Sequence, residues 1–130
     1  MKCCCCSDEV FADCCQRFIS GGSKPATAEE LMRSRFSAYA TGAVEYILCS
    51  THPSTRRFHD AKSIDNWAKA NVWQGLEIVS KTGGAVTDKK GTVEFKAYFL
   101  DENRQPQIHH ELSNFAKELG KWFFVDGKVL

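Results

Sequence analysis

The chain that follows Glu30 places apolar side chains at the three- and four-residue spacing of amphipathic helices. Residues 27–30 have the form of a capping box, in which the Thr27 hydroxyl and the Glu30 carboxylate satisfy backbone N–H groups at a helix start. Gly42 interrupts the apolar pattern, and Pro53 follows its end. We therefore expect two consecutive helices, the first running from the capping box to Gly42 and the second ending before Pro53.

A shorter pattern, with Ile64, Trp67 and Ala68 on one face, predicts a third helix over residues 63–70. From residue 73 onward, apolar and polar residues alternate as in a half-buried strand. Turn residues divide this part into predicted strands over residues 73–81, 92–101, 107–118 and 121–126. Helices followed by consecutive strands favour an α+β fold, in which three helices cover one face of a curved antiparallel sheet.

Length sets the domain organisation. A chain of 130 residues can bury one core but is too short for two independent ones. Residues 20–26 are rich in glycine and serine and contain a proline, which is typical of a linker. We expect a small cysteine-rich head over residues 1–19 and the α+β domain over residues 27–130. No apolar run approaches the roughly 20 residues of a membrane helix, so we expect no membrane segment.

Charge and cysteine usage narrow the partners and the compartment. Lys and Arg total 17 against 16 Asp and Glu, a net charge of +1, so we expect no nucleic acid held by bulk electrostatics. Of the 7 cysteines, all but Cys49 lie within the first 15 residues, and no secretory signal precedes them. We expect a cytoplasmic protein with reduced thiols. Cys49, inside an apolar helix, is typical of a small core residue.

The cysteines of the head suggest a metal centre. Cys3, Cys5, Cys14 and Cys15 form two close pairs that are separated by a short loop. Zinc takes four sulfur ligands tetrahedrally, and metal binding can supply the folding free energy that so small a segment lacks. We therefore expect a structural zinc site on these four residues. The spacing leaves other options open, because Cys4 and Cys6 are also available, and adjacent cysteines can bind copper(I) or form mixed disulfides.

The head has its characteristic residues in the order Cys3-x-Cys5-x-Ser7, Phe11 and Cys14-Cys15. This order resembles the SEC-C motif, a zinc-binding module found at the C-terminus of the translocase motor SecA. The resemblance implies that the four cysteines of this pattern are the zinc ligands. Cys4 and Cys6 depart from the motif, because they stand where proline and glycine are usual.

The body contains further blocks in order, at residues 29–38, 51–53, 73–76, 93–95, 111–115 and 122–127. Together with the head, they resemble the YchJ-type family of uncharacterised bacterial proteins. The resemblance implies a fold like nuclear transport factor 2, in which three helices pack against a strongly bent sheet to form a cone. It also agrees with the order of helices and strands inferred from the residues.

Four polar residues of the body are candidates for a ligand cavity in the cone: Arg33, Arg35, His52 and Asp126. Ordinary roles compete with this one. The two arginines lie two residues apart in a helix, so they point in different directions, and either could pair with a carboxylate. His52 stands at a helix end, where it could be a cap. Asp126 and Gly127 together are typical of a turn.

Two functions follow from these observations. The first is an interaction protein, in which a zinc-ordered head contacts a macromolecular partner; the likeness to the SecA tail suggests a chaperone, a ribosome or a secretion component. The alternative is a small-ligand binder or enzyme that uses the cone. No Ser-His-Asp order, phosphate loop or dinucleotide fingerprint is present, and we assign no catalytic residue.

Overall fold

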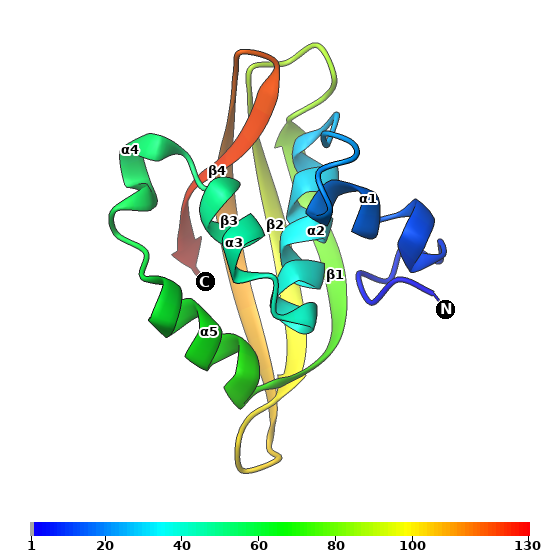
Figure 1. The fold of residues 1–130 in the computed structure, drawn as a ribbon, viewed down its shortest axis with the longest axis vertical. Coiled ribbons are helices and arrows are strands. Elements are labelled where there is room, and N and C mark those ends of the chain that lie inside the picture. The colour runs from blue at the N-terminus through cyan, green and yellow to red at the C-terminus, as the bar shows by residue number, and fades with distance from the viewer. Residues whose placement is uncertain (1) are drawn as a thin grey trace.

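A four-stranded sheet forms the centre of the body in the computed structural model, which describes residues 2–130. Its antiparallel strands follow one another in sequence order, β1-β2-β3-β4, and cover Val72–Gly83, Lys90–Leu100, Pro106–Glu118 and Lys121–Val129 (Figure 1). Register shifts occur between Trp73 and Gly75, between Ile78 and Ser80, and between Asn114 and Phe115. Such bulges bend a strand and increase its twist, which gives the sheet its curvature.

Strand β2 has the regular alternation expected from the sequence. Its side chains Val93, Phe95, Ala97 and Phe99 are buried, and the residues between them are more exposed. The expected turn at Asp126 and Gly127 is wrong, because both residues lie inside β4. Glycine leaves room there for the Glu111 side chain on the neighbouring strand, which would have to move if residue 127 carried a Cβ.

The helices precede the sheet and begin with the short helices η1 and α1 of the head, at Phe11–Asp13 and Gln16–Ile19. Those of the body are α2 (Ala28–Thr41), α3 (Val44–Cys49), α4 (Pro53–Arg56) and α5 (Ala61–Ala70). Helices α2, α3 and α5 are the three expected from the apolar pattern. Within residues 2–130, no helix has the length and apolar character needed to cross a membrane.

Most helix ends follow the signals in the sequence. The Thr27 hydroxyl accepts a hydrogen bond from the Glu30 amide, and α2 ends at Gly42, whose φ of 77° is left-handed. Two expectations need correction. Pro53 does not merely follow a helix, since it opens α4, where its missing N–H costs nothing. Helix α5 begins at Ala61, two residues before the expected start, because the Asp60 carboxylate caps it by accepting a hydrogen bond from the Ser63 amide.

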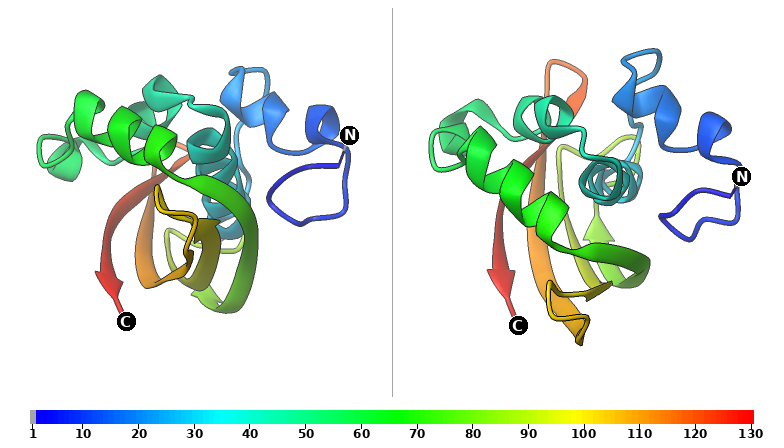
Figure 2. Two further views of the ribbon diagram at one scale, coloured as in Figure 1. Left: turned by 90° about the horizontal axis from the view of Figure 1, so that it is seen from below. Right: turned by 60° about the horizontal axis from the view of Figure 1, so that its bottom comes forward.

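The core lies between α2 and the inner face of the sheet, and the sheet bends around α2 while α5 lies across the remaining side (Figure 2). Leu31, Phe36, Val93 and Trp122 are among its most buried side chains. The cysteines of the head join the same cluster of buried residues. The fold is therefore α+β, with helices on one face of a curved antiparallel sheet and the head packed beside α2.

Candidate metal centre

The four cysteines expected to bind metal converge in the head. The sulfur atoms of Cys3, Cys5, Cys14 and Cys15 all lie within 4.8 Å of one another, and the four residues are buried. The Sγ atom of Cys14 lies 3.6 Å from that of Cys5 and 3.8 Å from that of Cys15. With Zn–S bonds of about 2.3 Å, the sulfurs of a regular tetrahedral site are about 3.8 Å apart. The four sulfurs therefore have the spacing that a single metal ion requires.

The backbone of the head brings the two cysteine pairs together. A tight reversal follows the first pair, with Cys6 and Asp8 both in the left-handed region at φ values of 67° and 69°. The Cys3 amide donates to the Glu9 carbonyl at 2.7 Å, which closes the loop. Helix η1 then leads directly into the second pair at Cys14. The rest of the loop consists mainly of turns. The cluster of four sulfurs is therefore the feature of the head that points to a particular chemistry.

The other three cysteines lie outside this cluster. The Cys4 sulfur contacts the Ser37 hydroxyl at 3.3 Å, and the exposed Cys6 sulfur accepts a hydrogen bond from the Leu76 amide at 3.5 Å. Cys49 is exposed on α3, so its expected place in the core is wrong; the apolar face of that helix buries Ile47 instead. The structure thus separates the two cysteines that depart from the SEC-C pattern from the four that match it.

The hydrogen bonds among the clustered thiols favour the deprotonated, negatively charged form of one of them, Cys5. A hydrogen bond from Cys15 lowers the pKa of Cys5 to about 4, against the effect of burial, and Ser7 adds to this stabilisation. Burial raises the pKa of Cys14 to about 11, and donation to Cys5 raises the pKa of Cys15. A buried thiolate surrounded by further thiols is an arrangement that a soft or borderline cation neutralises, with release of the remaining protons.

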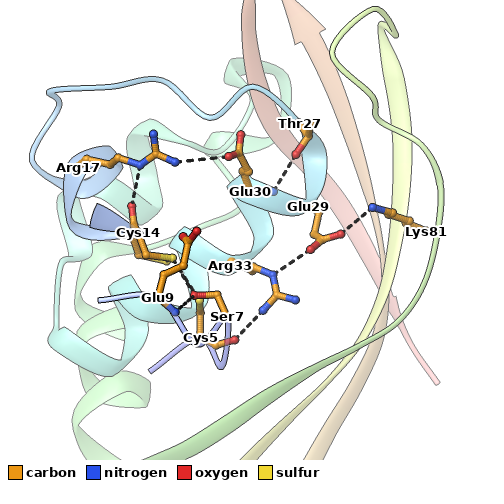
Figure 3. Close-up of polar contacts among 11 residues, drawn as sticks. Cys5, Ser7, Glu9, Cys14, Arg17, Thr27, Glu29, Glu30, Arg33 and Lys81 are labelled. Atoms are coloured by element: carbon orange, nitrogen blue, oxygen red, sulfur yellow. Dashed lines mark hydrogen bonds and ion pairs between the residues drawn. The ribbon is translucent and has the colours of Figure 1, made fainter. Parts of the chain in front are cut away.

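Arg33 connects the cysteine cluster to the body (Figure 3). Its Nη1 atom donates to the Cys5 carbonyl at 2.8 Å, and its Nε atom donates to a Glu29 carboxylate oxygen at 3.0 Å. Lys81 on β1 reaches the other oxygen of Glu29 at 2.8 Å. These contacts lower the pKa of Glu29, the hydrogen bond from Lys81 most of all. The chain Cys5–Arg33–Glu29–Lys81 thus joins the head, α2 and β1.

Arg17 makes a second connection, also drawn in Figure 3. Its Nε atom donates to the Cys14 carbonyl at 3.2 Å, and its Nη2 atom lies 3.5 Å from Glu30. A third contact joins the Cys3 sulfur to the Ser37 hydroxyl at 3.5 Å. Both cysteine pairs are therefore held against α2 by polar contacts as well as by burial.

The four residues expected to share a ligand cavity are not brought together. Arg33 faces the head, as described above. His52 caps α4 by accepting from the Ser54 amide, and its Nε2 atom lies 2.8 Å from Glu118. Asp126 is exposed on β4 and accepts from Asn114. Of the four, only Arg35 lines the cavity between α2, α5 and the sheet.

Sequence reasoning missed other polar residues of this cavity. His109, Glu111 and Ser113 lie at alternate positions of β3 and all line it, opposite Ala97, Phe95 and Val93 of β2. The sequence pattern that could have identified them is the two-residue period of a strand. This period places all three residues on the same face of β3 as the buried Phe115.

Known proteins resemble this chain over nearly its whole length. The family model described as "YchJ, middle NTF2-like domain" matches residues 27–127. A UPF0225 protein of Geobacter sulfurreducens is 41% identical over 125 residues, which cover 96% of this chain and 77% of that protein. A UPF0225 protein of Chromobacterium violaceum is 40% identical over 127 residues, covering 97% and 92% respectively.

Solved structures agree with these matches. The solution structure of a SEC-C motif containing protein from Rhodopseudomonas palustris has a TM-score of 0.91 at 33% identity, covering 100% of this chain and 99% of its own. The crystal structure of a SEC-C motif containing protein from Psychrobacter arcticus has a TM-score of 0.84 at 36% identity, covering 100% and 83%. The chain belongs to the YchJ-type UPF0225 family, with a cysteine cluster in its head and an NTF2-like cone as its body.

Proposed function

We propose that this protein binds one zinc ion through Cys3, Cys5, Cys14 and Cys15, and that the ion orders the head against α2. The observation that carries the proposal is the approach of four buried sulfurs to within 4.8 Å of one another. Four protein ligands make the closed tetrahedral site typical of structural zinc, with no open position for a substrate. Thiolate ligands also disfavour magnesium and calcium, which prefer oxygen.

The charges around the site support a thiolate-bound dication. Four thiolates and one Zn²⁺ sum to a net charge of about −2. Two guanidinium groups lie beside the ligands, because Arg33 donates to the Cys5 carbonyl and Arg17 to the Cys14 carbonyl. Hydrogen bonds of this kind fix the orientation of ligating residues, and the positive charges offset the excess negative charge.

We further propose that the outer side of the head contacts a protein or a ribosome-associated partner. Val10 is 48% exposed in the loop between the two cysteine pairs, where it forms a backbone bridge with Lys2. The acidic residues Asp8, Glu9 and Asp13 of the same segment are also exposed and form the acidic rim of the head, although Asp8 pairs with Lys2 at 3.6 Å. A metal that joins the two ends of this loop holds these side chains in one arrangement. The acidic rim suits a partner with a basic surface.

All 7 cysteines are free, which supports placing the protein in a reducing compartment such as the cytoplasm.

Metal content tests the first proposal. Protein expressed with ample zinc is expected to contain about one equivalent by elemental analysis, and Cys14→Ser with Cys15→Ser is expected to reduce this below about a tenth. Cys49→Ser is the matched control, because it removes an exposed thiol outside the cluster. Zinc absent from the parent protein, copper in its place, or equal zinc in the double variant would contradict the proposal.

Site-specific crosslinking tests the partner. A photoreactive residue replaces Val10 in the zinc-loaded protein, and Phe58, which is 71% exposed on the body, serves as the control position. We expect one protein to crosslink at position 10 only, and to be lost when Cys14 and Cys15 are serine. The same products at both positions, or no dependence on the two cysteines, would contradict a zinc-dependent docking surface.

A further inference from the structure

A second candidate site lies inside the cone, apart from the cysteine cluster. A cavity of about 240 Å³ lies between α2, α5 and the inner face of the sheet. Its apolar walls consist of the side chains Met32, Phe36, Trp67, Trp73, Phe95, Ala97 and Phe124. The aromatic rings pack edge to face, with Trp67 and Trp73 at a centroid distance of 5.9 Å. Such walls suit an apolar or aromatic body.

Arg35 is the unusual residue of this cavity, because it is a buried cation with no carboxylate in direct contact. Its side chain is only 5% exposed, and the guanidinium lies 4.4 Å from the centre of the Phe124 ring. The Nη1 atom donates to the Ile47 carbonyl and to the hydroxyls of Ser50 and Thr51. Within residues 2–130, no carboxylate lies within ion-pair distance of Arg35.

Two donors of Arg35 stay available. Nη1 makes the hydrogen bonds described above, and no protein acceptor is present for Nε or Nη2 within the described chain. Every fully enclosed side-chain nitrogen and oxygen among these residues has a partner. The Nε and Nη2 atoms must therefore border open space, and the open space that Arg35 lines is the cavity. A guanidinium edge with two free N–H donors matches the two oxygens of a carboxylate.

The remaining polar groups of the cavity include one acidic residue, which attracts Arg35 through space but does not contact it. Glu111 is the acidic residue of the cavity wall, but its oxygens accept from Ser113 and pair with His109 at 2.8 Å. Burial raises the pKa of Tyr39, which therefore stays a neutral donor. Burial and the charge of Arg35 lower the pKa of His59, so its ring is neutral at pH 7. Arg35 is thus a charged group of the cavity wall that has no carboxylate in ion-pair contact.

We propose that the cone binds a small carboxylic acid with an apolar or aromatic body, its carboxylate on Arg35 and its body against the rings of Trp67, Trp73 and Phe95. Pockets for drug-sized ligands measure roughly 300–1,000 Å³, so this cavity suits a smaller molecule of about the size of benzoate. The ligand places a negative charge in direct contact with the buried guanidinium, which no carboxylate of the described chain does. This site is independent of the proposed zinc site, since no cysteine of the head lines the cavity.

Three probes separate the contributions to binding. The intact zinc-loaded protein is titrated with benzoate, with its uncharged analogue benzamide, and with acetate, which lacks the ring, and backbone amide shifts are followed by NMR. We expect benzoate to shift residues of α2, α5 and β2 that line the cavity, and to bind at least about tenfold more tightly than either analogue. No shifts up to about 10 mM benzoate, shifts elsewhere, or equal binding of benzamide would overturn the proposal.

Substitutions in the cavity wall are expected to change the affinity for benzoate in opposite directions. Glu111→Gln removes a negative charge from the cavity, so it is expected to tighten benzoate binding severalfold and to leave benzamide unchanged. The matched control is Glu94→Gln, because Glu94 pairs with His110 outside the cavity. A gain in affinity cannot come from misfolding. Weaker benzoate binding by Glu111→Gln, or the same gain by Glu94→Gln, would overturn the proposal.

Blocking the cavity complements these tests. Ala97→Leu adds apolar volume to a buried wall residue without touching Arg35, and it is expected to weaken benzoate at least about tenfold. Arg35→Lys keeps the positive charge but removes the two parallel N–H donors of the guanidinium, and it is expected to weaken benzoate binding by a similar factor. An amide spectrum like that of the parent shows whether each variant folds. A folded Ala97→Leu variant that binds benzoate as well as the parent would place the ligand elsewhere.

Discussion

The head and the cone are held together by different interactions. The cone encloses a continuous apolar core, with Leu31, Val93 and Trp122 almost fully buried and each strand paired along most of its length. The head has two short helices and one isolated backbone bridge, between Lys2 and Val10, and its buried centre consists largely of sulfur. The cone can therefore fold by burying apolar surface, whereas the head has little such surface and, in our proposal, is ordered by the zinc ion among its thiols.

Removal of the metal is expected to have the largest effect, and it separates the two regions. Structural zinc contributes about 10–16 kcal/mol to the folding of zinc-finger peptides, far more than the few contacts of this head can replace. Chelation is expected to abolish amide protection in residues 3–18 while the amides of β2 and β3 keep theirs. Hydrogen exchange followed by NMR measures both regions in one sample. Equal loss of protection in head and cone would mean that the two form a single folding unit.

A change in the core of the cone should affect both regions. Trp122 is 1% exposed, and its indole donates to the Ala26 carbonyl at 3.1 Å. Trp122→Ala is expected to lower the free energy of unfolding by about 3–5 kcal/mol, because it leaves a cavity where α2 meets the sheet. The head should lose protection too, since it packs on α2. Phe58→Ala, at a side chain that is 71% exposed, is the control and should change stability little.

Chemical denaturation at fixed zinc measures the effect of Trp122→Ala. If the head kept full amide protection while the cone unfolded, the head would not depend on packing against α2. The proposed difference between the two regions, a self-sufficient cone and a dependent head, would then be wrong.

Local signals in the sequence predicted most of the cone. The capping box at Thr27, the stop at Gly42 and the alternation of β2 depend on neighbouring residues, so they could be recognised without a structure. The opposite directions of Arg33 and Arg35 also follow from helical geometry, with one facing the head and the other the cavity. The fold class and the cysteine cluster could also be predicted, because both follow from patterns among residues that are close together in the sequence.

The cavity was harder to predict because its polar residues come from elements that meet only in three dimensions. Arg35 lies on α2, while Glu111 lies on β3, and nothing in their separation along the chain indicates that they share a wall. His52 and Asp126 were plausible by residue type, but tertiary contacts gave them other partners, Glu118 and Asn114. The role of Arg33 beside Cys5 was likewise invisible until the head was seen to pack on α2.

Loss of Arg33 should loosen the head by an intermediate amount. Arg33→Gln removes the donor to the Cys5 carbonyl and the partner of Glu29, at an expected cost of about 1–2 kcal/mol to head docking. The rate of zinc transfer to a colorimetric chelator is expected to rise about tenfold, while thermal unfolding of the cone hardly changes. Arg57→Gln, at an exposed arginine after α4, is the control. An unchanged transfer rate would mean that Arg33 does not support the metal centre.

The smallest effect, and the only stabilising one, is expected at Cys6. Its φ of 67° lies in the left-handed region, where an L-residue is disfavoured by about 1–2 kcal/mol and glycine is not. Cys6→Gly loses a weak contact with the Leu76 amide but relieves this strain, so the head should gain about 1 kcal/mol. Amide protection of residues 3–18 should then rise about fivefold at constant zinc, with β2 and β3 unchanged. Cys6→Ala keeps the strain while removing the sulfur, and a matching gain in that variant would assign the effect to the thiol instead of the backbone. Because the change lies outside the four-sulfur cluster, an increase confined to the head would show that its loop geometry limits its stability even when the metal is bound.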